Sequence, residues 1–238
     1  MRCDILTIFP SIIDSYSGES ILKRGRKSGA LEVHSYDFRK FAQDKHRKVD
    51  DSPYGGGPGM VLKVDPIYYC LEHLKLARGG KKIGRNKKIK VIIMDPAGKE
   101  FTQKMAQQFS ALDRLVIICG RYEGFDERVY KCVDEKVSVG DYVLAGGELP
   151  ALTVLEATAR LVPGVIGNPD SLKEETHGSA RGGSKNGGKT KGEQGKMYVE
   201  YPQYTRPSEF LDMKVPSVLL SGHAKKIKEW REKKSKIK

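Results

Sequence analysis

Three short strand-like runs, the first two of them apolar, each continue directly into a glycine-bearing loop, and they constrain the fold more than any other feature. The runs occupy 91–94 (VIIM), 115–119 (LVIIC) and 136–139 (KVSV). Strands buried on both faces of a sheet have continuous apolar sequences such as 91–94 and 115–119. Residues 102–110 and 148–161 have helical apolar spacing, and buried strands that alternate with helices are typical of an α/β fold with a parallel sheet.

The first 77 residues extend the same pattern. Strands are predicted at 2–9 and 31–37, a helix after Pro10, and a helix from Asp65–Pro66 to Ala77, because proline suits a first helical turn. Residues 45–60 hold four glycines and two prolines and predict a loop, as do the seven basic residues of 78–90. Ligands bind at the carboxyl ends of the strands in open α/β sheets, so the loops after the three runs form the candidate site.

The domain boundaries follow from a change of composition. Residues 178–196 contain seven glycines, five basic residues and one acidic residue, which is too little apolar surface to order a segment. We therefore predict an α/β domain over 1–165, a flexible interdomain linker over 166–200 and a small helical domain over 201–238.

The charge balance indicates a polyanionic partner. Lysine and arginine number 43 against 30 acidic residues, for a formal net charge of +13. Such an excess is mildly unfavourable for folding and suits nucleic acid, although a basic protein with no such partner is the ordinary alternative.

The four cysteines contain no C-x-x-C pair, which disfavours zinc and fits a reducing cytoplasm. No run of about 18 apolar residues is present to span a membrane, and residues 1–13 indicate a strand and turn rather than a signal peptide.

Two glycine-rich loops are candidates for an adenosine-binding site. The loop 120–124 (GRYEG) and the segment 138–150 (SVGDYVLAGGELP) match neither a dinucleotide fingerprint nor a phosphate-binding P-loop. Glycines allow backbone amides to approach a ligand closely, and Glu123 is able to accept hydrogen bonds from a ribose hydroxyl or an amine. The competing interpretation is an ordinary turn with a solvated Arg–Glu pair.

Several isolated residues have both a functional and an ordinary interpretation. Arg160 ends a helical run, where an arginine is usually a solvated partner of the helix dipole; functionally, it is a cation aimed at an oxygen that gains charge. Glu174, Glu175 and His46 lie in loop segments, where such side chains are usually solvated.

A series of long motifs resembles one family. They are PYGGGPGM (53–60), GRYEGFDERV (120–129), SVGDYVLAGGELPA (138–151), LVPGVIGN (161–168), YPQYTRP (201–207) and VPSVLLSGHAKKIKEWR (215–231). In order and spacing they resemble the bacterial tRNA (guanine-N1)-methyltransferases, the TrmD family, from residue 1 to about residue 231. Only 178–196 looks foreign in composition.

The resemblance implies a fold, a reaction and partners. The fold would be a SPOUT-type parallel sheet with a C-terminal trefoil knot, one of the rare exceptions to unknotted topology, plus a small helical C-terminal domain. The enzyme would be a cytoplasmic homodimer with active sites between subunits. It would transfer a methyl group from S-adenosylmethionine to N1 of the guanine at tRNA position 37, normally with guanine at position 36. Mg²⁺ stays open as a second cofactor; no carboxylate cluster defines a metal site, so no metal ligand is assigned.

The resemblance also implies site residues. Arg160 matches the arginine that the family directs at the guanine O6, and Glu175 matches its general base, although the family's string there is commonly D-S-F and this chain has E-T-H. The change lengthens the base by one methylene, and Glu174 is the alternative. The implied donor-binding residues are Met94, Asp95, Pro96, Gly120, Tyr122, Glu123, Gly124, Val139, Gly140, Tyr142, Leu144, Gly146 and Gly147.

Two other functions remain as alternatives. A knotted methyltransferase that acts on a ribose 2′-hydroxyl would share the donor loops, but the matches over 45–60 and 201–231 disfavour it. A basic RNA-binding protein without activity would bind no S-adenosylmethionine.

Overall fold

The computed structural model describes residues 1–83, 86–168 and 198–237. The chain divides into two compact units, Met1–Gly167 and Asn168–Lys238. Most of the predicted linker, together with Glu174 and Glu175, lies at 169–197, outside the described residues.

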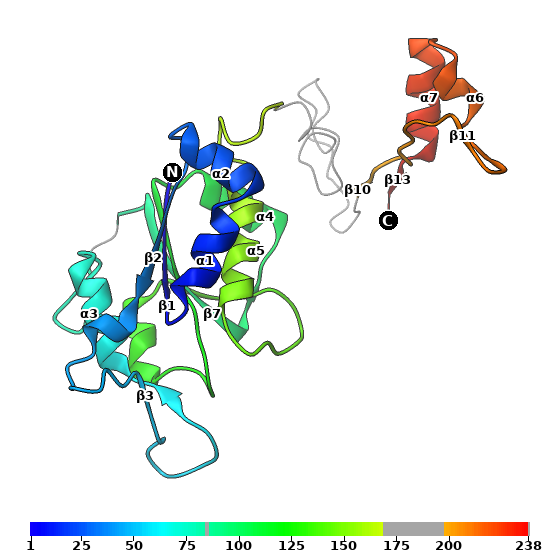
Figure 1. The fold of residues 1–238 in the computed structure, drawn as a ribbon. Helices are drawn as coiled ribbons and strands as arrows, with labels where there is room; N and C mark the ends of the chain where they lie inside the picture. Colours follow the sequence, from blue (N-terminus) through cyan, green and yellow to red (C-terminus); the bar gives the residue numbers. More distant parts are fainter. Residues whose placement is uncertain (84–85, 169–197, 238) are drawn as a thin grey trace, which may run out of the picture. The chain divides into compact units, whose positions relative to one another are not determined.

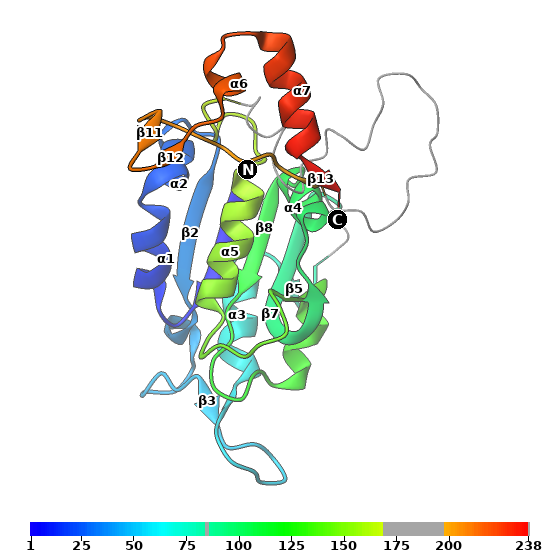
Figure 2. The ribbon, with the colours of Figure 1, turned by 90° about the vertical axis from the view of Figure 1, so that its right-hand side faces the viewer.

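A parallel sheet organises the first unit (Figure 2). Among the described residues, five strands pair side by side in the order β2-β1-β8-β7-β9, and every pairing is parallel. This confirms the predicted α/β class with a parallel sheet. The strands are β1 (Arg2–Thr7), β2 (Glu32–Asp37), β7 (Ile89–Glu100), β8 (Arg114–Ile118) and β9 (Glu135–Ser138).

Helices cover both faces of the sheet (Figure 1). One face packs against α1, α2, α4 and α5, and the other against α3 and a short 3-10 helix, η2. The helical elements are α1 (Pro10–Ser17), α2 (Ser20–Lys27), η1 (Phe38–Phe41), α3 (Val64–His73), α4 (Gln103–Ser110), η2 (Glu127–Cys132) and α5 (Glu148–Ala159).

Alternate residues of the central strands supply the two cores. In β8, Leu115 and Ile117 face the α5 side, whereas Val116 and Ile118 face the α3 side, and all four are fully buried. Burial on both faces explains why this strand has a continuous apolar sequence. The four cysteines are also buried, as free thiols.

Strand β7 extends beyond its prediction. The apolar run predicted a strand over 91–94, but the strand continues to Glu100, with a bulge between Met94 and Lys99, both of which pair with Val137. Gly98 permits this close return, because a Cβ at that position would lie 2.5 Å from the backbone nitrogen of Val137. The residues that follow Met94 do not continue the apolar run, so the run did not predict this extension.

Three further elements depart from the sequence-based expectation. Helix α2 was not predicted, because it buries only Leu22 and Gly25 and so lacks a clear apolar period. The predicted basic loop at 78–90 begins as a hairpin of β5 (Ala77–Arg78) and β6 (Lys81–Lys82). The predicted 45–60 loop contains β3 (Asp50–Asp51), which pairs with β4 (Val61–Leu62).

The second unit is small and mixed. Its rings gather around α7, with Tyr204 and Trp230 6.3 Å apart and the Arg231 guanidinium 4.8 Å from the Tyr201 ring. Its described elements are the helices α6 (Ser217–Leu220) and α7 (Ala224–Lys234) and the paired strands β10 (Tyr198–Val199) with β13 (Lys236–Ile237) and β11 (Glu209–Phe210) with β12 (Met213–Lys214).

Across both units, no described helix has the length and apolarity needed to cross a bilayer.

Candidate functional site

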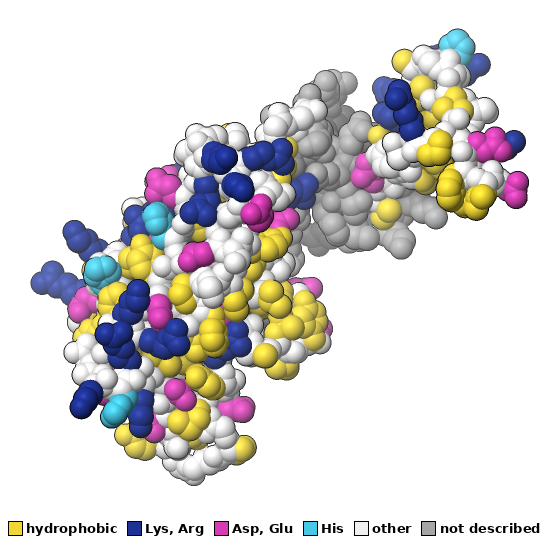
Figure 3. Space-filling view, in the orientation of Figure 1, with side chains coloured by type: hydrophobic (Ala, Val, Ile, Leu, Met, Phe, Trp, Pro, Cys, Tyr) yellow, Lys and Arg dark blue, Asp and Glu magenta, His cyan; other side chains and the backbone are white. Residues whose placement is uncertain are grey.

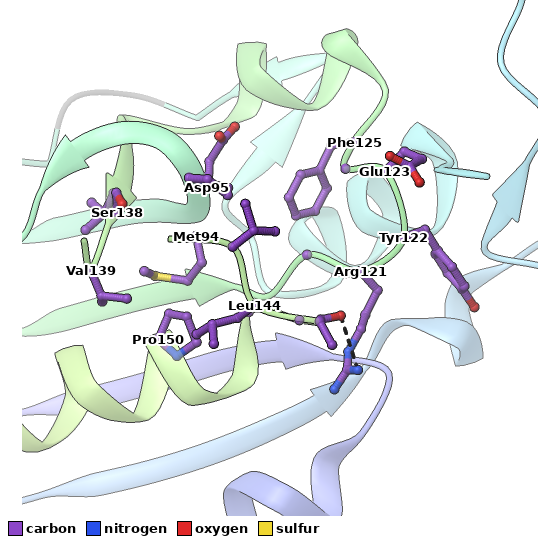
Figure 4. Close-up of a pocket in the computed structure, with 18 of the residues that line it drawn as sticks. Met94, Asp95, Arg121, Tyr122, Glu123, Phe125, Ser138, Val139, Leu144 and Pro150 are labelled. Atoms are coloured by element: carbon purple, nitrogen blue, oxygen red, sulfur yellow. Dashed lines mark hydrogen bonds between the residues drawn. The ribbon is translucent and has the colours of Figure 1, made fainter. Parts of the chain in front are cut away.

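A pocket of about 320 Å³ lies beside the bulge of β7 and at the carboxyl ends of β8 and β9 (Figure 4). Its volume falls in the range of small-molecule sites. Its walls come from the bulge of β7, from the loops that follow β8 and β9, and from the first turn of α5. Twelve of the thirteen predicted donor residues line it: Met94, Asp95, Pro96, Gly120, Tyr122, Glu123, Gly124, Val139, Tyr142, Leu144, Gly146 and Gly147. Gly140, the thirteenth, is not among the lining residues.

The loop after β8 has a strained backbone that neighbouring strands hold in place. Tyr122 has a φ of 58°, which is uncommon for a residue with a side chain and frequent at functional sites. The Leu62 N–H donates to the Gly124 carbonyl at 2.9 Å, and the Glu123 N–H donates to the Met60 carbonyl at 3.0 Å. These bonds anchor the loop on β4.

The glycine-rich segment 53–60 approaches the same loop. A Cβ at Gly59 would lie 2.4 Å from Cγ of Glu123, and Gly59 has a φ of 80°. The motif was predicted as a loop of close backbone approach, and at Gly59 the contact is with the Glu123 side chain. Glu123 itself remains exposed at the pocket.

Asp95, in the bulge of β7, is oriented by protein groups. Its carboxylate accepts hydrogen bonds from the Tyr130 hydroxyl at 2.7 Å and from the Ala97 N–H at 2.8 Å. The Lys136 ammonium lies 3.8 Å from the same carboxylate and 3.6 Å from the centre of the Tyr130 ring. Burial and the bond to Asp95 raise the pKa of Tyr130, which keeps its hydroxyl protonated and donating.

The loop after β9 folds on itself and then returns to the β8 loop. The Tyr142 N–H donates to the Gly140 carbonyl at 2.9 Å, and the Tyr142 hydroxyl donates to the Val139 carbonyl at 3.3 Å. Further along, the Gly147 N–H donates to the Gly120 carbonyl at 2.8 Å. The two glycine-rich loops therefore meet, as expected for loops from strands at one edge of the sheet.

Sequence reasoning missed several lining residues. Phe125, Glu127 and Tyr130 lie just beyond the GRYEG motif, and Pro150 lies in the first turn of α5. The apolar residues of 125–130 were the available signal, because they follow a strand whose carboxyl end was already predicted as the site. Arg121, which the competing interpretation of the GRYEG loop treats as solvated, also lines the pocket.

The two predicted catalytic residues are not brought to this pocket by the described part of one chain. Arg160 follows the last residue of α5, whose first turn lines the pocket. The helix has 12 residues, so its ends are about 18 Å apart at a rise of 1.5 Å per residue. Glu175 and Glu174 lie outside the described residues.

The described residues contain no group of three or more His, Cys, Asp or Glu side chains that could hold a metal ion.

The loop after β9 gives a testable prediction at Gly140. Its φ is 152°, and a Cβ there would lie 2.5 Å from the Tyr142 ring. Valine cannot keep both the backbone and the ring in place, so Gly140→Val should shift Tyr142 and weaken binding of S-adenosylmethionine by roughly tenfold or more, since sparsely populated backbone conformations cost about 1–3 kcal/mol. Calorimetry measures the affinity. Gly167→Val is the control, because an added Cβ at Gly167 meets nothing within 4 Å. Unchanged affinity in folded Gly140→Val would contradict the assignment of this loop.

Known proteins with similar sequences identify the family of this chain. The whole chain, residues 1–238, matches the family model described as tRNA (Guanine-1)-methyltransferase TrmD. Curated relatives named tRNA (guanine-N(1)-)-methyltransferase come from Dictyoglomus turgidum, Geobacillus kaustophilus and Clostridioides difficile. The first is 45% identical over 98% of this chain and 84% of its own length. The second is 44% identical over 99% and 86%, and the third 43% identical over 99% and 92%. The resemblance drawn from the motifs is thereby confirmed: the chain belongs to the TrmD family of tRNA (guanine-N1)-methyltransferases.

Proposed function

We propose that this protein transfers a methyl group from S-adenosylmethionine to N1 of the guanine at position 37 of tRNA. Family membership supports the reaction class. The observation that carries the proposal is the pocket beside the β7 bulge and the carboxyl ends of β8 and β9, because it gathers twelve residues predicted to bind the donor. The chain's net charge of +13 suits a polyanionic substrate.

The chemistry of the pocket fits the donor. S-adenosylmethionine supplies a methyl group already activated on a sulfonium. Glycine backbone from two loops is positioned to bind an adenosine group, and the exposed carboxylate of Glu123 is available to a ribose hydroxyl or to the donor's amino group. The protein's main task is then alignment of the methyl group with N1.

We further propose that the pocket is built on a C-terminal trefoil knot. Support comes from the close contact between the loops after β8 and β9: a Cβ at Gly147 would lie only 2.7 Å from the backbone nitrogen of Gly120. Residues 201–238 would then form the helical domain that contacts tRNA, and the lysine-rich α7, with Lys225, Lys226 and Lys228 exposed, would bind phosphates. The knot is a proposal about how these loops are threaded.

The active form is proposed to be a homodimer with sites shared between subunits. Arg160 lies one helix length from the pocket of its own chain, so a second chain is needed to supply it. Hydrophobic side chains also gather on the loop that precedes α5 (Figure 3), where Tyr142, Val143 and Leu144 are exposed, Val143 to 83%. Exposed apolar groups of this kind mark interaction surfaces.

Subunit mixing tests this arrangement. At a donor concentration well below the raised Kd of the donor-loop variant, Gly140→Val and the base variant Glu175→Gln should each have little activity alone. Mixed under conditions where subunits exchange, they should recover part of the methylation activity, because some dimers combine one intact donor loop with one intact base. Absence of recovery after verified exchange would argue against a shared site.

The proposed chemistry needs a base and a cation. N1 of guanine carries a proton, and removal of that proton moves negative charge onto O6. Glu175 would accept the proton, and Arg160 would stabilise the charge on O6. The guanine must first leave its stack in the anticodon loop.

Mg²⁺ remains a proposed second cofactor without assigned ligands. The cytoplasm is the proposed location, because the proposed substrate of the enzyme is tRNA.

Donor binding separates this function from its rivals. Calorimetry on the protein alone should detect binding of S-adenosylmethionine, and incubation with a tRNA transcript should then transfer the methyl group to a base. An RNA-binding protein without activity would show no donor binding. A ribose methyltransferase would bind the donor but place the methyl group on a 2′-oxygen, and either result would contradict the proposal.

A further inference from the structure

One buried ion pair beneath the donor pocket is not explained by the proposed reaction. Glu148, at the start of α5, has a carboxylate that is 2% exposed and lies 2.8 Å from the Arg121 guanidinium. Both residues lie at the pocket: Arg121 lines it, and Glu148 follows its lining residue Gly147. Burial of a charge pair is unfavourable unless its geometry and its remaining hydrogen bonds are good, so the partners of this pair are informative.

The two oxygens of the Glu148 carboxylate accept hydrogen bonds from two different segments of the chain. Oε1 accepts a hydrogen bond from the Thr7 hydroxyl at 2.7 Å, and Oε2 accepts one from Arg121 Nε at 3.0 Å. Thr7 is the last residue of β1 and is fully buried. Glu148 therefore joins the end of β1 to the loop after β8.

Arg121 extends the network to the third segment. Its guanidinium donates to the Ala145 carbonyl at 3.4 Å (dashed in Figure 4) and lies 4.5 Å from the centre of the Phe9 ring. Arg121 also bridges Gly146 in an antiparallel pairing. The planar fork of arginine suits such simultaneous contacts, whereas a lysine ammonium does not.

Gly146 is explained by this pair. A Cβ at Gly146 would lie 2.2 Å from Arg121 Nε and 2.6 Å from Glu148 Oε2. The glycine that was predicted to approach the donor is thus also required by the ion pair underneath. The backbone of 145–147 is fixed between the Arg121–Glu148 pair on one side and the pocket on the other.

We propose that Arg121 and Glu148 are positioning residues that hold the two glycine-rich loops in the conformation that binds the methyl donor. This inference rests on the proposed function, because it assigns the pocket to the donor. The pair acts through the backbone of 120–124 and 145–147, so it serves the adenosine part of the ligand and does not itself bind the donor's amino-acid carboxylate.

The same strands supply a matched control at their opposite ends. Asp4 of β1 is fully buried and pairs with Arg114, the first residue of β8, and with Arg2. Asp4→Asn removes a buried carboxylate from β1 that neither lines the pocket nor bonds to the Arg121–Glu148 pair. It should lower the melting temperature without changing affinity for the donor.

The test uses Glu148→Gln, which keeps the shape and removes the charge, and Arg121→Lys, which keeps the charge and removes the fork. Affinity is measured by calorimetry, without tRNA, for S-adenosylhomocysteine and for 5′-methylthioadenosine, which lacks the amino-acid group. Both variants should bind both analogues roughly 10- to 100-fold more weakly, the range expected when hydrogen bonds to charged groups are lost. The donor KM should rise while kcat at saturating donor changes little.

Three results would overturn the inference. Unchanged affinity in both folded variants would show that the pair is irrelevant to the donor. Loss of S-adenosylhomocysteine binding with methylthioadenosine binding retained would make Arg121 a direct ligand of the amino-acid carboxylate. An equal loss in Asp4→Asn would reduce the effect to general destabilisation. If Glu148→Gln does not fold, Arg121→Lys decides alone. Failure of the wild-type protein to bind either analogue would overturn the proposed function itself, and the inference with it.

Discussion

Replacing Glu175 with glutamine should lower the single-turnover rate of methyl transfer by about 10²–10⁴-fold, the usual contribution of general acid–base catalysis. Glutamine keeps the shape of the side chain and removes the proton acceptor. Glutamate is largely ionised near neutral pH, as a base must be. The measurement is the rate of tRNA methylation with the enzyme in excess over tRNA and the donor saturating, repeated across a range of pH.

Two neighbouring variants serve as controls for this result. Glu175→Asp should retain activity, because aspartate is the family's common residue in the aligned string, and Glu174→Gln should be nearly neutral. An inactive Glu174→Gln with an active Glu175→Gln would move the base by one residue. Activity in both glutamine variants would mean that neither glutamate is the sole base.

Arg160→Ala should reduce the rate of methyl transfer by about 10²–10³-fold, by analogy with loss of one donor to a developing oxyanion. The expected cause is loss of the cation that stabilises charge on the guanine O6. Donor affinity should barely change, since Arg160 is assigned to the guanine O6 and is not among the residues that line the donor pocket. Single-turnover kinetics and calorimetry measure the two quantities separately.

An exposed arginine on α2 provides the comparison for Arg160. Arg24→Ala removes the same side chain from the surface of the same unit and should leave the single-turnover rate at saturating tRNA nearly unchanged. If Arg160→Ala instead lowers donor affinity and leaves the rate intact, the role assigned to Arg160 is wrong.

The sheet and the position of the pocket were predictable because strands buried on both faces need apolar residues at consecutive positions. Continuous apolar runs such as 115–119 occur where a strand is covered on both faces. The carboxyl ends of parallel strands lie at one edge, so the loops after 94, 119 and 139 had to meet there. The individual donor residues were implied by the family resemblance, and twelve of them line one pocket in this region.

Other features depend on contacts that sequence periodicity does not encode. Helix α2 buries too few residues to show a helical period, and the extension of β7 depends on how Gly98 fits against Val137. The Arg121–Glu148 pair joins residues 27 positions apart in the sequence, and only the folded loops bring them together. Arg160 was predicted from family resemblance alone, and a single chain does not place it at the pocket.

The most direct test of the account is identification of the methylated nucleoside. The protein is incubated with S-adenosylmethionine and tRNA transcripts that carry guanine or adenine at position 37, with guanine or another base at position 36, and the digested product is analysed by mass spectrometry. The account predicts 1-methylguanosine at position 37 from the transcript with guanine at both positions, and none from the transcript with adenine at 37. A 2′-O-methylated nucleoside, or 1-methylguanosine that still forms when position 37 is adenine, would contradict it.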